Sequence, residues 1–219
     1  FNSSIFSAML NSWGAEAAAF PIVKDDPVLI ENALREAVKQ CDVVILNAGS
    51  SAGREDYSAG AIAAVGKVLF HGIAIKPGKP AILGVSGTTP VLGVPGYPVS
   101  GIIVIEQILK PVIDALLGRV TPAPETEKAV LTRNAMSTLK YREFVRVRLG
   151  YVNGKLVASP LSRGSGVVSS FMKADGIMEI PQEVEGFAAG DTVDVRLLKP
   201  KTELERTVVA IGSHDPLLD

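Results

Sequence analysis

The first half of the chain alternates between two hydrophobic patterns. Apolar residues recur every three or four positions in stretches that predict amphipathic helices, and they form short continuous runs that predict strands. The predicted helices are Ser3 or Ser4 to Gly14, Pro27 to Val38, 58–65 and 99–117. The predicted strands are 17–23, 42–46, 67–75, 81–85 and 91–94. Helices that alternate with short apolar strands indicate a layered α/β domain.

Two local features sharpen this prediction. The sequence Asp25-Asp26-Pro27 favours a helix start, because carboxylates accept hydrogen bonds from free N–H groups and proline suits the first turn. The run 42–46 (DVVIL) is almost continuously apolar, which is typical of a strand buried on both faces, as in a parallel sheet.

The second half of the chain has a period of two. Alternating apolar and polar residues predict strands at 128–133, 143–150, 176–181 and 191–198. Asn153-Gly154 lies between two further apolar runs, and this pair strongly favours a two-residue hairpin turn. About five short strands within roughly 70 residues indicate a small barrel or sandwich.

A change in composition separates the two halves. Segment 119–127 (RVTPAPETE) has two prolines and mixed polar residues, which indicate a linker. We therefore predict an α/β domain over 1–118, the linker over 119–127 and a small all-β domain over 128–198. The tail 199–219 is predicted to be the possible start of a further domain.

Composition excludes several classes of function. The 22 Lys and Arg against 23 Asp and Glu give a net charge of −1, which argues against a nucleic-acid or anionic-membrane partner. One cysteine, Cys41, cannot form an internal disulfide, and with only two histidines a His/Cys zinc site is not expected. No run of 18 uncharged apolar residues predicts a transmembrane helix.

The first candidate site is the loop 46–57 (LNAGSSAGREDY), directly after a predicted buried strand. In open α/β sheets ligands bind beyond the carboxyl ends of strands, and a Gly/Ser loop there lets backbone N–H groups approach an anion. Asp56 could bind a metal ion or a ligand hydroxyl. The structural alternative is a simple turn in which Asp56 caps the next helix.

Two further loops carry candidate chemistry. In 76–80 (KPGKP) two lysines flank a Pro-Gly turn and suit an oxyanion or phosphate, although a solvated turn is the commoner reading of such a pair. In 93–100 (GVPGYPVS) two prolines stiffen a loop that can hold a pocket in shape. The alternative for this loop is plain helix initiation, with Pro98 in the first turn.

The β half offers a weaker signal. Arg142, Arg146 and Arg148 stand at even spacing and hence on one face of a predicted strand. Segment 163–170 (RGSGVVSS) is a second Gly/Ser loop. An arginine face on a strand is more often a solvated or salt-bridged surface than an anion site.

Taken in order, six segments resemble the molybdopterin molybdenumtransferase family, which includes the bacterial MoeA proteins and the E domain of gephyrin. They are KDDP (24–27), NAGSSAGREDY (47–57), HGIAIKPGKP (71–80), GVPGYPVS (93–100), YREFVRVRL (141–149) and SRGSGVVSSFMKADGI (162–177). The resemblance implies a three-layer α/β domain of the molybdopterin-binding type followed by a small barrel-like β domain. It also implies molybdenum cofactor biosynthesis: molybdenum from molybdate enters the dithiolene of adenylylated molybdopterin, and AMP is released. A cytoplasmic homodimer that uses Mg²⁺ is the implied setting.

The resemblance also implies roles for residues. Asp25 and Asp56 are the implied catalytic carboxylates, and Asp56 is the implied Mg²⁺ ligand. The implied substrate-binding residues are Ser51, Lys76, Lys79, Pro95, Pro98, Arg142, Arg146 and Ser165. Lysines and loop N–H groups suit the dianionic molybdate and the phosphates of the pterin.

The sequence departs from the family pattern at two loops. Asn47-Ala48-Gly49 stands where the family has two glycines, and Tyr97 replaces the usual asparagine of the proline loop. A pterin or molybdate sensor without turnover is therefore an alternative to the enzyme, and a scaffold role is a third hypothesis. The family's preceding strand would lie before Phe1, and 206–219 resembles the opening of a fused binding domain, so residues 1–219 alone are expected to have little activity.

Overall fold

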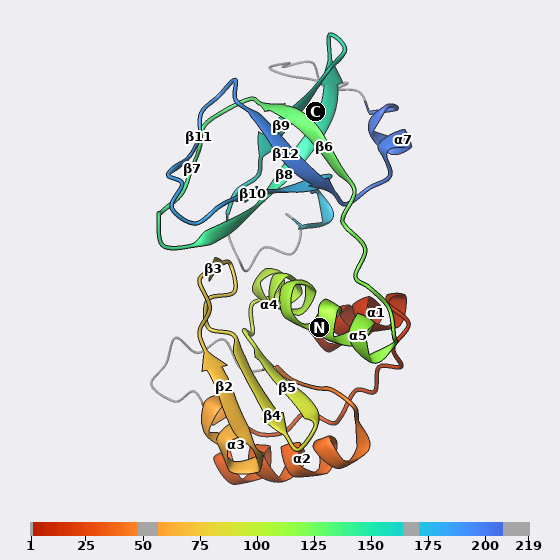
Figure 1. Ribbon diagram of the computed structural model, residues 1–219, viewed down its shortest axis with the longest axis vertical. Helices are drawn as coiled ribbons and strands as arrows, with labels where there is room; N and C mark the ends of the chain where they lie inside the picture. The colour runs from red at the N-terminus through yellow and green to blue at the C-terminus, as the bar shows by residue number, and fades with distance from the viewer. Residues whose placement is uncertain (1, 48–56, 164–170, 208–219) are drawn as a thin grey trace. The chain divides into compact units, whose positions relative to one another are not determined.

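The computed structural model describes residues 2–47, 57–163 and 171–207. The chain divides into two compact units, Phe1–Pro122 and Ala123–Asp219. We call them the α/β unit and the barrel unit and describe each by itself (Figure 1).

A four-stranded mixed sheet forms the centre of the α/β unit. Its strands are β1 (Val44–Asn47), β5 (Thr89–Val94), β4 (Ile82–Ser86) and β2 (Lys67–His71), in that spatial order. β1 runs parallel to β5, whereas β4 is antiparallel to both β5 and β2. The parallel pairing expected for 42–46 is thus confirmed, but the rest of the described sheet is antiparallel.

Helices cover both faces of this sheet, so the unit has three layers (Figure 1). On one face, α2 (Pro27–Gln40) and α3 (Tyr57–Val65) bury a core with Val44 and Val91 from the sheet. On the other face α4 (Pro98–Val104) contacts β5, and α1 (Asn2–Ser12) contacts α4. Neighbours on a strand point to opposite faces, and Val91 and Leu92 are both fully buried, which requires cover on both sides.

The helix predicted over 99–117 has a five-residue π turn in its middle. The order is α4, then η1 (Ile105–Leu109), then α5 (Lys110–Leu116). Pro111 accounts for the irregularity: it lacks an N–H, and its ring would collide with a carbonyl of the preceding turn in a continuous α-helix. The hydrophobic periodicity of the sequence does not predict this π turn.

Other helix predictions are confirmed in part. Asp26 caps α2, its Oδ1 accepting hydrogen bonds from Val28 N at 2.9 Å and Leu29 N at 3.0 Å. Ser3 and Ser4 do not cap α1, since this helix already includes Asn2.

Two strand predictions need correction. Segment 17–23 is irregular and mostly exposed, because its apolar side chains find no strand partner within the described residues. The predicted strand 67–75 is interrupted after His71, and only a two-residue strand, β3 (Ile75–Lys76), follows.

The barrel unit is a closed five-stranded barrel. Its strands are β6 (Thr126–Leu131), β8 (Arg142–Val152), β9 (Lys155–Pro160), β10 (Gly176–Ile180) and β12 (Thr192–Leu197). They pair in the cycle β8–β10–β12–β6–β9–β8, with β6–β9 the single parallel pair of that cycle. The barrel form of the two predicted alternatives is therefore confirmed.

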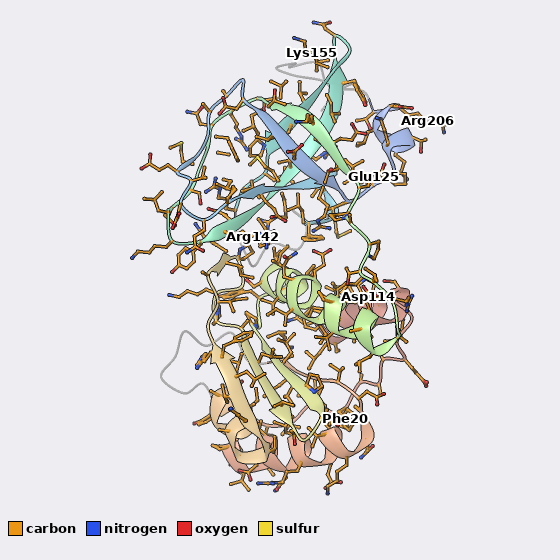
Figure 2. All side chains as sticks on the ribbon, in the orientation of Figure 1. Phe20, Asp114, Glu125, Arg142, Lys155 and Arg206 are labelled. Atoms are coloured by element: carbon orange, nitrogen blue, oxygen red, sulfur yellow. The ribbon has the colours of Figure 1, made fainter. Side chains whose placement is uncertain are left out.

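Small elements complete the barrel unit. Asn153 and Gly154 turn the β8–β9 hairpin with φ of 49° and 76°, the positive values that this turn requires (Lys155, which follows, is labelled in Figure 2). A ribbon pairs β7 (Ala135–Met136) with β11 (Gly186–Phe187), and α7 (Lys201–Leu204) buries Leu204 in the barrel core. Among the described residues, no helix is long and apolar enough to cross a membrane.

Candidate functional site

Two of the predicted loops and the end of β1 lie at one end of the sheet in the α/β unit. The parallel register sets Asn47 of β1 beside Val94 of β5, so both strands end at the same edge. The antiparallel register sets Ile82 beside Gly93, so β4 begins at that edge. We call this end of the sheet the loop edge. It carries Asn47 at the end of β1, the proline loop after Val94 and the lysine turn before Ile82.

Asn2 contacts both the last residue of β1 and the proline loop. Its side chain is 9% exposed, and Nδ2 donates to the Gly96 carbonyl at 2.7 Å and to Asn47 Oδ1 at 3.3 Å. One amide thereby ties the end of β1 to the proline loop. Sequence reasoning missed Asn2, because its partners are 45 and 94 positions away and local patterns carry no signal for such contacts.

The proline loop is stiff and partly buried. Pro95 is buried, whereas Tyr97 is 48% exposed at the N-cap position of α4, where its side chain makes no capping hydrogen bond. Pro98 occupies the first turn of α4, so the helix-initiation reading of this loop is confirmed. Tyr97 stays exposed beside this helix start.

The lysine turn 76–80 is closed by backbone hydrogen bonds. Ile73 N donates to the Lys79 carbonyl at 2.9 Å, and Gly72 N donates to the Ala81 carbonyl at 2.8 Å. Gly78 is buried with φ of 117°, and a Cβ there would lie 2.7 Å from Val104 Cγ2, so glycine is required. The side chains of Lys76 and Lys79 are exposed on either side of this fixed point.

The remaining carboxylate prediction in this unit is Asp25. It is exposed and stands directly before Asp26, the N-cap of α2. Figure 1 shows α2 at the opposite end of the unit from β3, which carries Lys76. The structure therefore does not group α2 with the lysine turn.

The three strand arginines of the barrel unit have distinct surroundings. Arg142 is exposed and ion-paired with Glu179, Nη2 to Oε2 2.6 Å, and Arg148 Nε donates to Asp175 Oδ2 at 2.9 Å. Arg146 is 4% exposed, and its Nη2 donates to the Ser162 carbonyl at 2.9 Å. Burial lowers the pKa of the Arg146 guanidinium.

Asp175 is the centre of a charged network in the barrel unit. It is buried and accepts hydrogen bonds from Lys199 Nζ at 2.6 Å, Arg148 Nε at 2.9 Å and Leu149 N at 3.0 Å. Burial pushes the pKa of Asp175 upward, but the hydrogen bonds from Lys199 and Leu149 and the charge of Arg148 outweigh it and hold the pKa below 3.8. This carboxylate is therefore ionised and structural at neutral pH.

Two family models match these two units in order. Residues 1–115 match the model described as probable molybdopterin binding domain. Residues 128–198 match the MoeA C-terminal region, domain IV. The chain belongs to the MoeA family of molybdopterin-binding proteins.

MoeA proteins of known sequence and structure support this membership. The molybdopterin molybdenumtransferase of Haemophilus influenzae is 31% identical over 191 residues, covering 85% of this chain and 47% of the relative. The crystal structure of a molybdopterin biosynthesis MoeA protein from Pyrococcus horikoshii superimposes with a TM-score of 0.76 at 34% identity, covering 91% of this chain and 48% of the other. A molybdenum cofactor biosynthesis protein from Pyrococcus furiosus gives 0.70 at 31% identity, with coverages of 90% and 64%. The chain spans about half the length of the curated relatives it matches.

Several residues assigned through the MoeA resemblance lie outside the described residues. They are Ser51, Asp56 and Ser165. Within the described ranges, no three His, Cys, Asp or Glu side chains come together to hold a metal ion.

Proposed function

We propose that this chain takes part in molybdenum cofactor biosynthesis as the molybdopterin-binding and C-terminal portion of a molybdopterin molybdenumtransferase. The substrates would be molybdate and adenylylated molybdopterin, and AMP would be released. The observation that supports this proposal most directly is that the proline loop and the lysine turn lie together at the loop edge of a MoeA-family fold.

The loop edge offers the chemistry that such substrates need. Lys76 and Lys79 are exposed cations on a turn fixed by backbone hydrogen bonds and by Gly78, so they suit a dianion such as molybdate. Pro95 and Pro98 hold the neighbouring loop stiff, which lowers the ordering cost of binding. Because the dithiolene sulfurs of the pterin bind the metal, the protein's task is positioning and charge stabilisation.

The remaining parts of this proposal rest on the family resemblance. Ser51 and Asp56 would complete the first loop, with Mg²⁺ held by Asp56 and by substrate phosphates. A cytoplasmic homodimer is the expected form. Arg142, Arg146 and Ser165 stay predictions, and the Glu179 and Ser162 partners of the two arginines favour a structural role for them.

The test is molybdenum insertion by the full-length protein with adenylylated molybdopterin and molybdate. Asp56→Asn is expected to lower kcat at least a hundredfold, on the order of the loss of one key electrostatic group. The matched control is Asp42→Asn, an exposed carboxylate just before β1, which is expected to leave the rate unchanged. Equal rates for the parent and Asp56→Asn would show that Asp56 is not part of the active site. If the full-length parent inserts no molybdenum, the proposed enzymatic function is wrong.

A second function, a pterin or molybdate sensor without turnover, is favoured by one observation. Tyr97 presents a half-exposed aromatic ring on the proline loop, where the family has an asparagine. An aromatic ring there would change the shape of a ligand site beside this loop and would leave both lysines of the lysine turn in place. Molybdopterin binding without AMP release in the same assay would select this function, and Tyr97→Asn would then be expected to restore turnover.

A further inference from the structure

A buried ion pair holds the end of α1 that is remote from the loop edge. Asp114 of α5 is 2% exposed, and its Oδ2 accepts a hydrogen bond from Lys110 Nζ at 2.5 Å. Lys110 Nζ also lies 5.6 Å from the ring centroid of Trp13, the residue that follows α1. Figure 2 shows Asp114 on α5 beside α1. One carboxylate therefore orients the lysine whose cation–π contact holds this end of α1.

Arg119 adds a second contact to the same end of α1. Its Nη2 donates to the Trp13 carbonyl at 2.7 Å, and its backbone N donates to the Asp114 carbonyl at 2.7 Å. Gly14, with φ of 88°, leaves space for this guanidinium, since a Cβ there would lie 2.8 Å from Nη2. We call this group of four residues the α1 clasp: Trp13, Lys110, Asp114 and Arg119.

Burial distinguishes the ion pair of the clasp from exposed pairs of the same spacing. The Asp114 and Lys110 side chains are 3% and 22% exposed. Glu31 and Arg35 of α2 also stand at i and i+4, but their side chains are 35% and 48% exposed. The hydrogen bond from Lys110 lowers the pKa of Asp114 although burial opposes it. A buried, ionised carboxylate needs its cation in place, so Asp114 fixes the position of Lys110.

The helix α1 connects the clasp with the loop edge. An α-helix rises about 1.5 Å per residue, so its 11 residues span roughly 16 Å. In its middle, Phe6 packs so closely on α4 that a Cβ at Gly101 would lie 2.5 Å from Phe6 Cζ. At its other end, Asn2 Nδ2 donates to the Gly96 carbonyl at 2.7 Å. A helix of this length is marginal by itself in water, so its position depends on these tertiary contacts.

We propose that Asp114 is a positioning residue for the loop edge: through Lys110 and Trp13 it fixes one end of α1, and α1 holds Asn2 against the proline loop. Asp114 acts through this helix and not on a ligand. For its effect on catalysis, this inference rests on the proposed function. Its effect on the proline loop is measurable without any substrate, so the two proposals can fail separately.

The first experiment follows the Asn2 side-chain amide and the Gly96 backbone amide by NMR in the whole chain. Asp114→Asn keeps the shape of the side chain and removes its charge. It is expected to shift both signals and to speed exchange of the Gly101 N–H, which donates to the Tyr97 carbonyl at 3.0 Å, about tenfold. Unshifted Asn2 and Gly96 signals in a folded Asp114→Asn would overturn the proposal, and thermal unfolding shows whether the variant is folded.

A second variant tests the same path at the end of α1. Trp13→Leu removes the ring that Lys110 contacts and leaves the buried ion pair with Asp114 intact. It is expected to shift the Asn2 signal in the same direction but by less, because Arg119 still binds the carbonyl of residue 13. If Asp114→Asn does not fold, this variant decides the outcome, and an unshifted Asn2 signal rejects the proposal.

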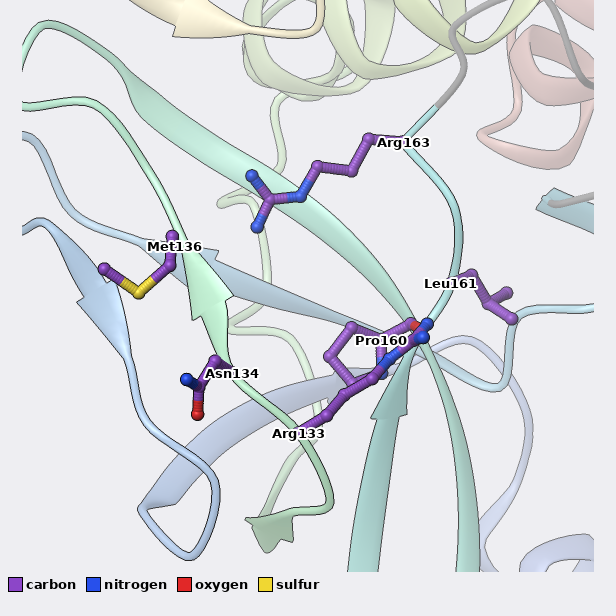
Figure 3. A pocket seen from close by; sticks show the side chains of 6 residues that line it. All are labelled: Arg133, Asn134, Met136, Pro160, Leu161 and Arg163. Atoms are coloured by element: carbon purple, nitrogen blue, oxygen red, sulfur yellow. The ribbon is translucent and has the colours of Figure 1, made fainter. Parts of the chain in front are cut away.

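Three control variants separate positioning from a general loss of stability or charge. Leu34→Ala opens the core on the other face of the sheet, so it should lower the melting temperature at least as far as Asp114→Asn without moving the Asn2 signal. Glu31→Gln breaks the exposed pair on α2, and Arg133→Gln removes a charge from the open pocket of the barrel unit (Figure 3). Both should leave the Asn2 signal in place. An equal shift in Leu34→Ala and Asp114→Asn would show that Asp114 contributes stability only.

The second experiment measures kcat/KM for molybdate in the full-length protein. Asp114→Asn is expected to lower kcat/KM about threefold, since it misplaces the proline loop. In a double variant with Asn2→Ala it should add little, because the contact that it positions is already lost. Fully additive losses would contradict the path through Asn2. If the parent inserts no molybdenum, the proposed function is wrong, and the NMR signals still decide whether Asp114 positions the loop edge.

Discussion

The charged side chains of the two units lie in different structural settings, beside a turn in the α/β unit and on strands in the barrel unit. In the α/β unit the candidate residues are Lys76, the last residue of the two-residue strand β3, and Lys79 in the turn that follows it at the end of a sheet. In the barrel unit Arg142 and Arg148 lie on a strand and are paired with Glu179 and Asp175. A turn can present a cation to a ligand, whereas a strand face usually commits it to a neighbouring strand. The residue type alone therefore does not tell whether a charged side chain binds a ligand or stabilises the fold.

The largest expected effect is on the barrel unit. Asp175→Ala removes the partner of Lys199, Arg148 and the buried Leu149 N–H, and we expect the free energy of unfolding to fall by about 2–3 kcal/mol. Urea denaturation measures this loss. Asp194→Ala, whose exposed carboxylate lies 4.0 Å from Lys128, serves as the control and should cost less than about 1 kcal/mol.

The pH dependence of the free energy of unfolding should report on the same network around Asp175. The pKa of folded Asp175 is lowered, so its stabilising contribution is present above the unfolded-state pKa and is lost as the pH falls through the folded pKa. The free energy of unfolding of the parent should therefore decrease below about pH 4 more steeply than that of Asp175→Ala. Parallel pH profiles for the two proteins would contradict an ionised Asp175.

The next effect belongs to the loop edge. Lys79→Gln in the full-length protein should raise the KM for molybdate about tenfold or more, since a charge-assisted hydrogen bond is lost, with little change in stability. Lys67→Gln is the matched control, because Lys67 is exposed at the other end of the same sheet. If both variants raise KM equally, the lysine turn has no special role and the contrast between the units fails.

A smaller effect is expected from Asn2. Asn2→Ala frees the proline loop from the end of β1, and a misplaced loop should lower kcat/KM roughly tenfold. Asn11→Ala, at the end of the same helix, is the control. If Asn2 positions the proline loop, kcat/KM should fall by more than the change in melting temperature explains. A loss of kcat/KM that is fully explained by the loss of stability would contradict this role.

The smallest effect tests the structural reading of the strand arginines. Arg142→Gln should reduce stability by less than about 1 kcal/mol, because its pair with Glu179 is exposed. The KM for molybdate should stay within twofold of the parent value. A tenfold rise would instead return Arg142 to the oxyanion site that the family resemblance implies.

Much of the fold follows from local sequence signals. The cap at Asp26 and the turn at Asn153-Gly154 are set by neighbours along the chain, and the alternation of apolar and polar residues marks the barrel strands, so pattern reasoning finds them. Segment 17–23 was predicted wrongly because a strand needs a partner, which its own residues cannot supply.

The candidate site divides in the same way. Proline and lysine spacing locates the proline loop and the lysine turn, but Asn2 acts through residues distant in sequence. Likewise, Arg142 and Arg146 share one strand face, and only tertiary packing makes the first exposed and the second buried. Sequence patterns therefore find loops and strands better than they find the side chains that connect them.

Closure of the barrel has a consequence for self-association. Among the described residues, each of the five barrel strands is paired on both sides, whereas β1 and β2 each have one unpaired side. Unpaired strand edges are templates on which other chains can add strands, and a closed barrel offers none. Aggregation through strand addition should therefore begin in the α/β unit, and hydrogen exchange on aggregates should find new protection in β1 or β2 before any change in the barrel.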